Sequence, residues 1–372
     1  GGRITIGYTN GSTGSLTLQA FGGTDSGGGG EDAAAGTIFT KSGAQTNGSL
    51  RIDNNGTVIS EYESIVTLVD NISNLDTFTA TGSAQVVAAS SDLTATTVTV
   101  GGNAIFTIAT GTTLSYTTID LSESGTIAEQ GVINFPSTFT IDAGETVRFD
   151  TPRSFTDLIV NGTVSHSPNI STQAHFVNLD ISGDLTINSG GSIDISDVGY
   201  GSGPGLEFGN GNGPGAGLSV NATDGGGGGA YGGDGGDSSD PQAGGSAYGS
   251  TTNPVQLGSS GGNGDVAGSG GGGGGLAILD VTGTTTINGS ITANGQNGVT
   301  TNNDGSGGGS GGGINLTTGG LEGTGSVTAN GGNGFDDTTR DGGGGGGGRI
   351  AIIFNSGDRK STRLNSSHLV IS

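Results

Sequence analysis

The sequence predicts an all-β protein, a right-handed parallel β-helix (β-solenoid) with long glycine-rich loops. Residues 289–298 (GSITANGQNG) and 325–334 (GSVTANGGNG) are near-copies 36 residues apart, and each precedes a glycine-dominated run. Short strands with alternating apolar residues recur along the chain, and no window shows a sustained helical period. A repeated strand, turn and glycine run is typical of one rung of a repeat architecture.

The composition favours a solenoid over a globular core. The chain has 372 residues, of which 84 are glycine and only 30% are apolar. A solenoid needs few apolar residues, because each coil buries only a thin strip against its neighbours.

Charge and hydropathy exclude several classes of partner. The formal net charge of −23 argues against nucleic acid, which requires a basic surface, and against anionic membrane surfaces. No apolar run approaches the roughly 18 residues of a membrane-spanning segment. We therefore expect no nucleic-acid partner and no membrane insertion.

Changes in composition divide the chain into four segments. Gly2-Arg3-Ile4 recurs as Gly348-Arg349-Ile350, which predicts slightly more than one unit of a longer tandem array. We interpret residues 1–56 as the end of a preceding glycine-rich repeat module, 57–175 as a Ser/Thr-rich β region (β-helix coils or a separate β-sandwich), 176–357 as a glycine-rich β-helix repeat module, and 358–372 as a non-native tail.

The tail differs sharply from the rest of the chain. Residues 358–368 (DRKSTRLNSSH) contain no glycine and carry three of the ten basic residues. They resemble, residue for residue, the in-frame translation of a sequencing-library adapter. We treat residues 358–372 as an artefact and exclude them from the fold prediction.

Expected strands follow from alternating apolar residues bounded by glycine and asparagine turn signals. In chain order the clearest are Arg3–Tyr8, Ser15–Ala20, Thr37–Lys41, Ser49–Asp53, Thr97–Val100, Ile105–Ile108, Phe139–Ile141, Thr146–Phe149, Leu158–Val160, Leu276–Val281, Thr285–Ile287, Ile291–Ala293, Ile314–Leu316, Val327–Ala329 and Arg349–Phe354.

The glycine runs admit two physical interpretations. They are either flexible linkers, because glycine loses the most entropy on ordering, or extended polyproline-II-like segments that pack closely because side chains are absent. The runs lead directly into strands at Gly275-Leu276 and Gly348-Arg349, which favours order in the shorter runs. Residues 221–272 remain open to either interpretation.

With Gly36-Thr-Ile-Phe-Thr-Lys-Ser42 and Ile291-Thr-Ala-Asn-Gly295 in view, the chain resembles the glycine-rich repeat regions of large bacterial surface and secreted adhesin-like proteins, which are commonly parallel β-helices. The resemblance implies an extracellular or cell-surface location and a structural or adhesive role. It implies cell-surface glycans or neighbouring repeats of the same chain as partners. It offers no catalytic residues.

Calcium is the one cofactor that the sequence suggests. Residues 232–237 (GGDGGD) and 331–336 (GGNGFD) fit the first six positions of the Gly-Gly-x-Gly-x-Asp calcium repeat. The carboxylate ligands would be Asp234, Asp237, Asp336 and Asp337. However, the aliphatic position of the repeat is Ser239 in one copy and Thr338 in the other, and neither copy is tandem. Solvated acidic turns are the alternative that the sequence favours.

Catalysis finds little support, so we expect no enzyme. Glycoside hydrolysis needs paired carboxylates, for which Asp336-Asp337 or Asp194 with Asp197 are the candidates. Adjacent strand residues face opposite sides, so Asp336 and Asp337 converge only in a loop. A polysaccharide lyase needs a basic residue beside calcium, but the basic residues are few and scattered.

The two histidines before the tail, His166 and His175, flank a proline in a polar segment. A zinc pair lacks a third ligand at suitable spacing, which favours surface or turn histidines.

Overall fold

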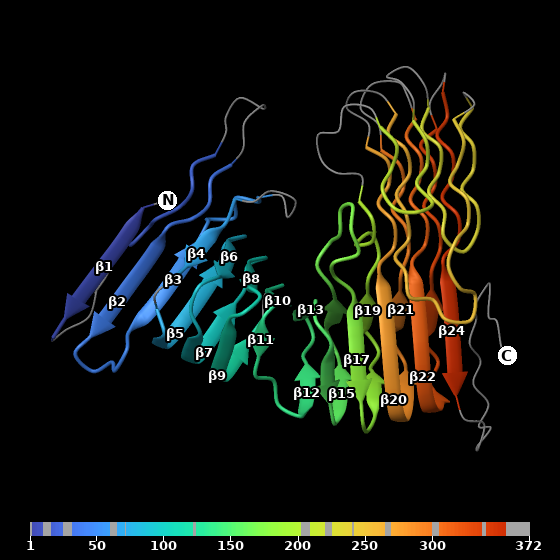
Figure 1. The fold of residues 1–372 in the computed structure, drawn as a ribbon. Helices are drawn as coiled ribbons and strands as arrows, with labels where there is room; N and C mark the ends of the chain where they lie inside the picture. Colours follow the sequence, from blue (N-terminus) through green and yellow to red (C-terminus); the bar gives the residue numbers. More distant parts are fainter. Residues whose placement is uncertain are drawn as a thin grey trace. The chain divides into compact units, whose positions relative to one another are not determined.

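The computed structural model describes residues 2–9, 16–24, 32–59, 65–70, 72–121, 124–201, 209–219, 225–239, 242–264, 269–299, 305–336 and 340–354, and all structural statements concern these residues (Figure 1). They form strands, turns and extended segments but no helix, so none of them forms a helix that could cross a membrane. Two compact units are present, Gly1–Pro136 with Gly144–Arg148 (unit 1) and Ser137–Ala143 with Phe149–Ser372 (unit 2). Each is described by itself.

Unit 1 contains two sets of paired strands. One follows the order β1-β2-β3-β5-β7-β9-β11 and the other the order β13-β10-β8-β6-β4. Their bounds are β1 Arg3–Tyr8, β2 Thr37–Ser42, β3 Ser49–Asp53, β4 Thr67–Val69, β5 Asn74–Thr81, β6 Gln85–Ala88, β7 Leu93–Val100, β8 Ile105–Ile108, β9 Thr113–Asp120, β10 Thr126–Glu129, β11 Val132–Ile133 and β13 Thr146–Phe149.

The strands of unit 1 pair in parallel from one coil to the next. Gln85 lies opposite Ile105, and Ile105 lies opposite Thr126, so the chain returns to the same column about every 20 residues. Inward side chains form the core: Phe78 and Phe106 are fully buried and their ring centroids lie 4.3 Å apart. The exception is β2, which pairs in parallel with β1 but antiparallel with β3.

Unit 2 also consists of paired columns of strands. One column has the order β23-β21-β19-β16, and a second sheet has the order β12-β15-β18-β20-β17-β14, with β22 pairing β20 and β24. Their bounds are β12 Thr138–Ile141, β14 Arg153–Phe155, β15 Asp157–Val160, β16 Thr163–Ser165, β17 Val177–Ile181, β18 Leu185–Ile187, β19 Ser192–Asp194, β20 Leu276–Ile287, β21 Ser290–Thr292, β22 Gly313–Glu322, β23 Ser326–Thr328 and β24 Arg349–Phe354.

The near-copies of the sequence stack directly on each other in unit 2. Ile291 of β21 lies opposite Val327 of β23, in a parallel pair whose flanking Ser and Thr residues are also in register. Every strand pair of unit 2 whose register is defined among the described residues is parallel. This all-β, parallel-strand arrangement is consistent with a β-solenoid.

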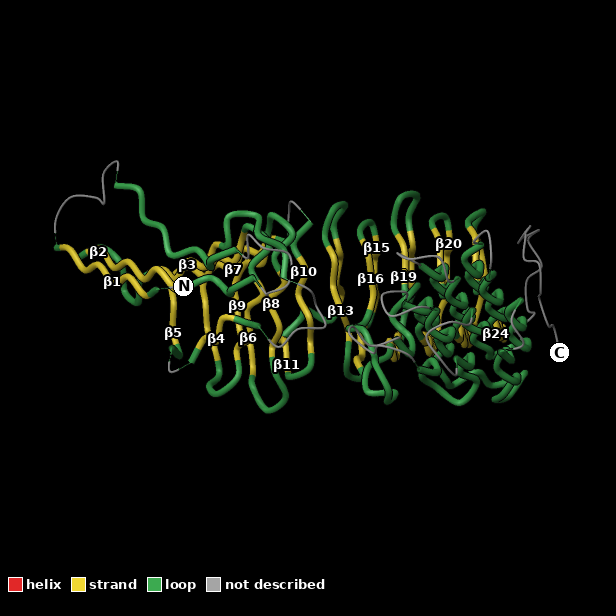
Figure 2. The backbone as a smooth tube through the Cα atoms, turned by 90° about the horizontal axis from the view of Figure 1, so that it is seen from above, coloured by secondary structure: helices red, strands yellow, loops and turns green. Residues whose placement is uncertain are grey.

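The glycine runs of unit 2 form extended segments beyond the ends of β20, β22 and β24, neither helical nor paired as sheet (Figure 1). Figure 2 shows them as a cluster of closely packed loops next to β20 and β24. We call them the glycine segments; their described residues are 209–219, 225–231, 232–239, 242–249, 256–264, 269–275, 293–299, 305–312, 329–336 and 340–348.

The glycine segments are held by hydrogen bonds that change partner with a period of three residues. Segment 225–231 donates hydrogen bonds to three neighbouring segments. Each neighbour accepts from two residues of 225–231 that lie three positions apart. The bonds are Gly226 and Gly229 to the carbonyls of Gly305 and Gly308, Gly227 and Ala230 to those of Leu218 and Gly215, and Gly228 and Tyr231 to those of Gly236 and Gly233. A period of three matches the three residues per turn of a polyproline-II helix.

Together the glycine segments form what we call the glycine bundle, and segment 305–312 lies at its centre. It donates to segments 256–264, 293–299 and 340–348 and accepts from three more, at residues 226 and 229, 271 and 274, and 332 and 335. A Cβ atom on Gly309 would lie 1.9 Å from the carbonyl oxygen of Gly272, so backbone fills the space that side chains fill elsewhere. The ordered, extended interpretation of the glycine runs is therefore confirmed for the described segments.

Several strand predictions are confirmed to the residue, including those for β1, β3, β8, β13 and β24. The predicted strands at 276–281 and 285–287 are one long strand, β20. The strand expected at 15–20 is wrong for its described residues 16–20. Among the described residues, β1 pairs with β2 rather than with this segment, and the Ala20 carbonyl accepts a hydrogen bond from the Gly36 N–H. The proposed tail lies outside the described residues.

Candidate functional site

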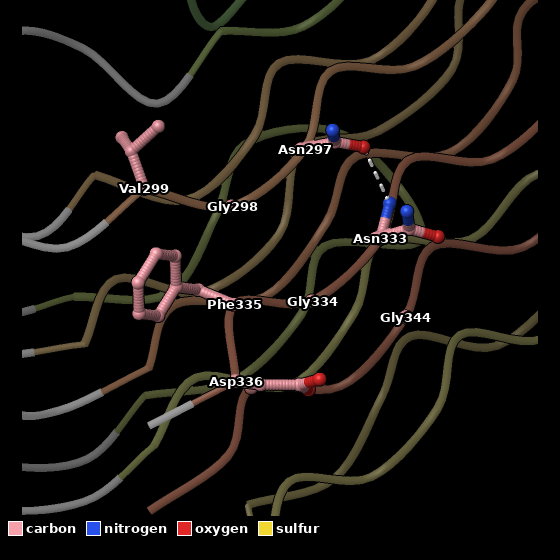
Figure 3. Close-up of a pocket in the computed structure, with 9 residues that line it drawn as sticks. Asn297, Gly298, Val299, Asn333, Gly334, Phe335, Asp336 and Gly344 are labelled. Atoms are coloured by element: carbon pink, nitrogen blue, oxygen red, sulfur yellow. Dashed lines mark hydrogen bonds between the residues drawn. The ribbon is translucent and has the colours of Figure 1, made fainter. Parts of the chain in front are cut away.

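A hollow of about 800 Å³ lies among three glycine segments of unit 2 (Figure 3). Its size is that of a small-molecule site. The residues that line it are Asn297, Gly298, Val299, Asn333, Gly334, Phe335, Asp336, Gly342 and Gly344. Most come from the stretches that follow the two near-copied strands, so the repeat itself builds this pocket.

A ladder of asparagines forms one side of the pocket. The Asn333 backbone N–H donates to Asn297 Oδ1 over 2.8 Å, and one turn earlier Asn330 does the same to Asn294 Oδ1, also over 2.8 Å. The ladder fixes the Asn297 carboxamide against the next coil (Figure 3). Among the described residues, no hydrogen bond is found for Asn297 Nδ2 or for the Asn333 carboxamide, which leaves these groups for a ligand.

Two apolar side chains lie at the other side of the pocket. Val299 is 49% exposed and Phe335 is 36% exposed, and Figure 3 shows them next to each other. The backbone of Phe335 is anchored, since its N–H donates to Ser306 and its carbonyl accepts from Gly342. The ring is thus held at the surface by bonds that do not involve the side chain.

Among the described residues that line the pocket, Asp336 is the only charged one. None of these described lining residues is a lysine or an arginine. The site therefore combines carboxamides, an exposed aromatic ring and one carboxylate, a set suited to a neutral polar ligand.

The four candidate calcium ligands lie on different parts of the bundle. The carboxylates of Asp234 and Asp237 accept hydrogen bonds from Ala247 N over 2.6 Å and from Gly244 N over 2.9 Å, and so cap segment 242–249. Asp336 lines the pocket, and Asp337 lies outside the described residues. In the part of the chain that the structure describes, no three His, Cys, Asp or Glu side chains form a group that could hold a metal.

The two histidines each have a separate structural partner. His166 is fully buried, and its Nε2 lies 3.3 Å from the Leu276 N–H. Nε2 therefore accepts, and Nδ1 carries the proton that it donates to the Ser167 carbonyl over 2.9 Å. His175 Nδ1 lies 3.7 Å from the buried Asp150 carboxylate. His166 thus supports the start of β20.

The carboxylates of Asp194 and Asp197 are in different environments. Asp194 Oδ1 accepts from Thr292 Oγ1 over 2.7 Å at the surface. Burial raises the pKa of Asp197 to about 6. A raised pKa arises at structural sites as well as at catalytic ones, so it does not by itself make Asp194 and Asp197 a catalytic pair.

Arg349, at the start of β24, binds backbone carbonyls of the bundle. Its Nε donates to the Tyr248 carbonyl over 3.0 Å and its Nη2 to the Tyr231 carbonyl over 3.3 Å. The guanidinium lies 5.5 Å from the centre of the Tyr231 ring. Burial raises the pKa of Tyr231 to about 12. The arginine that marks the repeat boundary in the sequence therefore joins a strand to two glycine segments.

No protein-family model, no curated protein and no solved structure matches this chain. The pocket is thus assessed on its own residues. Of these, sequence reasoning identified only Asp336, and as a metal ligand. The signal for Asn297 and Asn333 was present, because both occupy the same position of the two near-copies.

Proposed function

We propose that this chain is a non-catalytic structural and adhesive module of a large repetitive extracellular or cell-surface protein of bacterial type, built as a right-handed parallel β-helix. The parallel register of its coils supports the solenoid, because each coil presents the next with the same edge. The acidic surface supports solubility outside the cell.

The observation that carries the proposal is the glycine bundle. Six segments surround segment 305–312, and backbone hydrogen bonds join each of them to it. Such a block resists bending, because moving one segment breaks hydrogen bonds to several others. A module with rigid loops suits a spacer or stalk that holds a binding surface away from the cell. Its partners are neighbouring repeats of the same kind and cell-surface glycans.

Pulling the protein by its ends in a force spectrometer tests the structural role. We expect a cooperative unfolding event for the described part of unit 2, because the segments share their hydrogen bonds. Extension like a flexible linker, without a force peak, would contradict the proposal. A second assay measures reducing ends and unsaturated uronates released from a panel of polysaccharides. Turnover there would show an enzyme.

A calcium-stabilised repeat is the alternative that the two Asp-containing turns suggest. Since Asp234 and Asp237 already accept backbone hydrogen bonds, the turns are closed by the chain itself. We expect the melting temperature to be the same with calcium and with EDTA. A drop of more than about 10 °C in EDTA would favour the calcium alternative, because a ligand that binds only the native state stabilises it.

A further inference from the structure

We propose that the pocket of Figure 3 binds one residue of a neutral saccharide, with the sugar ring against Phe335 and its hydroxyl groups on the carboxamides of Asn297 and Asn333. The inference rests on the proposed adhesive function and gives it a site and a ligand class.

The carboxamides supply the polar half of the recognition. Each amide nitrogen donates and each amide oxygen accepts, and a sugar hydroxyl does both, so neighbouring hydroxyls match a pair of stacked amides. The ladder bond from Asn333 N to Asn297 Oδ1 fixes the Asn297 carboxamide before any ligand arrives. Pre-organisation of this kind reduces the entropy that binding costs.

Phe335 supplies the apolar half. An aromatic face carries partial negative charge, and the C–H groups on one face of a pyranose are weakly positive, so the two surfaces attract as well as exclude water. Val299 extends the apolar surface beside the ring. A ligand that was only apolar would leave the amides without partners, and a small ion would not cover the ring.

Charge selects neutral saccharides over acidic ones. Asp336 lines the pocket, none of the described lining residues is basic, and the chain has a net charge of −23. A carboxylate or sulfate on the sugar would be repelled, and the repulsion would weaken as salt is added.

Two glycines of segment 340–348 provide a matched pair of variants. Gly344 lines the pocket, and a Cβ atom on it would meet no atom within 4 Å. Gly347 lies three residues on, also has open space at its Cβ position, and does not line the pocket. Because three residues make one turn, the two positions share one face of the segment. A leucine at 344 fills the pocket, whereas a leucine at 347 leaves it open.

Saturation-transfer NMR on the full chain tests the proposal, with the methyl glycosides of glucose, galactose, mannose and N-acetylglucosamine as probes and that of N-acetylneuraminic acid as the acidic control. We expect transfer to at least one neutral probe. We expect Gly344→Leu to weaken its binding at least tenfold and Gly347→Leu to change it less than twofold. Asn333→Ala, which removes a carboxamide without a partner among the described residues, is expected to weaken binding even if Gly344→Leu fails to fold.

Three results would overturn the saccharide site: no transfer to any neutral probe, equal binding by the two leucine variants, or equal binding of the acidic control. None of these touches the structural role, which the force measurement tests separately. Conversely, hydrolysis of a bound glycoside would contradict the non-catalytic function while leaving the pocket assignment in place.

Discussion

The coils of unit 1 and the glycine bundle of unit 2 differ in how they satisfy backbone hydrogen bonds and how they fill their interiors. In unit 1 the backbone is bonded in sheets about every 20 residues, and side chains such as Phe78 and Phe106 fill the interior. In the bundle the backbone both makes the hydrogen bonds and fills the interior, as at Gly309. A side-chain core therefore tolerates changes of similar volume, whereas a backbone core tolerates no added atom.

The near-copies contain both kinds of core, a side-chain core at the strand and a backbone core in the glycine segment that follows. The buried strand position is Ile291 in one copy and Val327 in the other, a change that costs little in a side-chain core. The segments that follow stay glycine at the positions that contact other backbones, such as Gly295 and Gly331.

The largest effect is expected in the side-chain core. Phe106→Ala removes a fully buried ring that stacks on Phe78, and should destabilise unit 1 by about 3–5 kcal/mol. Hydrogen exchange of the β6 and β8 amides measures the loss. A change below about 1 kcal/mol would mean that these rings do not form the core.

The next effect tests the backbone core. Gly309→Ala places a methyl group 1.9 Å from the Gly272 carbonyl oxygen, where the nearest atoms are all backbone, and should destabilise the bundle by roughly 3 kcal/mol. Hydrogen exchange of residues 305–312 reports it. Gly347→Ala is the control, because its Cβ position is open, and it should change stability by less than about 0.5 kcal/mol. Equal effects would rule out a backbone-packed interior.

A partly buried carboxylate beside the bundle gives a pH-dependent effect. Because burial raises the pKa of Asp197 to about 6, the native state holds a proton that the unfolded state releases near pH 4. Stability should therefore fall as pH rises from about 4 to 6. Asp197→Asn should remove this fall and stabilise unit 2 at pH 7 by about 1–3 kcal/mol, with no gain below pH 4. Asparagine also tolerates the positive φ of this position, 59°.

Thermal unfolding at pH 4, 5, 6 and 7 measures the effect of Asp197→Asn. Asp180→Asn, on the exposed face of β17, is the matched control. A parallel pH dependence in wild type and Asp197→Asn would show that Asp197 is solvated in the native state.

The smallest effect concerns a side chain inside the bundle. Ser306 is fully buried, and its hydroxyl lies 2.9 Å from the Ser269 carbonyl and 2.5 Å from the Val299 carbonyl. Ser306→Ala should cost about 1 kcal/mol, because one hydrogen bond is lost and little volume changes. Exchange of neighbouring amides measures it. A loss as large as that of Gly309→Ala would mean that hydroxyls, rather than backbone packing, hold the bundle.

Most strands were predictable because their pattern is carried by side chains. The alternation of Leu179 and Ile181, or of Ile350 and Ile352, places apolar groups on one face, and both pairs lie in parallel strands of the observed sheets. The antiparallel pairing of β2 with β3 was not predictable, because the alternation of apolar residues in these two strands is the same as in the strands that pair in parallel.

The glycine bundle and the pocket were only partly predictable. Hydrogen bonds with a period of three involve only backbone groups, so a run such as 342–348 carries no residue pattern that tells an ordered segment from a linker. The pocket combines residues from segments 293–299 and 329–336, and only their near-identity in sequence indicated that they stack. The open side of Gly344 follows from the packing of its neighbours and leaves no trace in the sequence.

Hydrogen exchange tests whether backbone hydrogen bonds hold the glycine segments in one ordered structure. If backbone bonds from six neighbours surround segment 305–312, its amides should exchange as slowly as those of β20 and β22, at least a thousandfold slower than an unstructured chain of the same sequence. Exchange of residues 307–312 at unstructured rates while β20 stays protected would contradict the account, because the glycine runs would then be linkers.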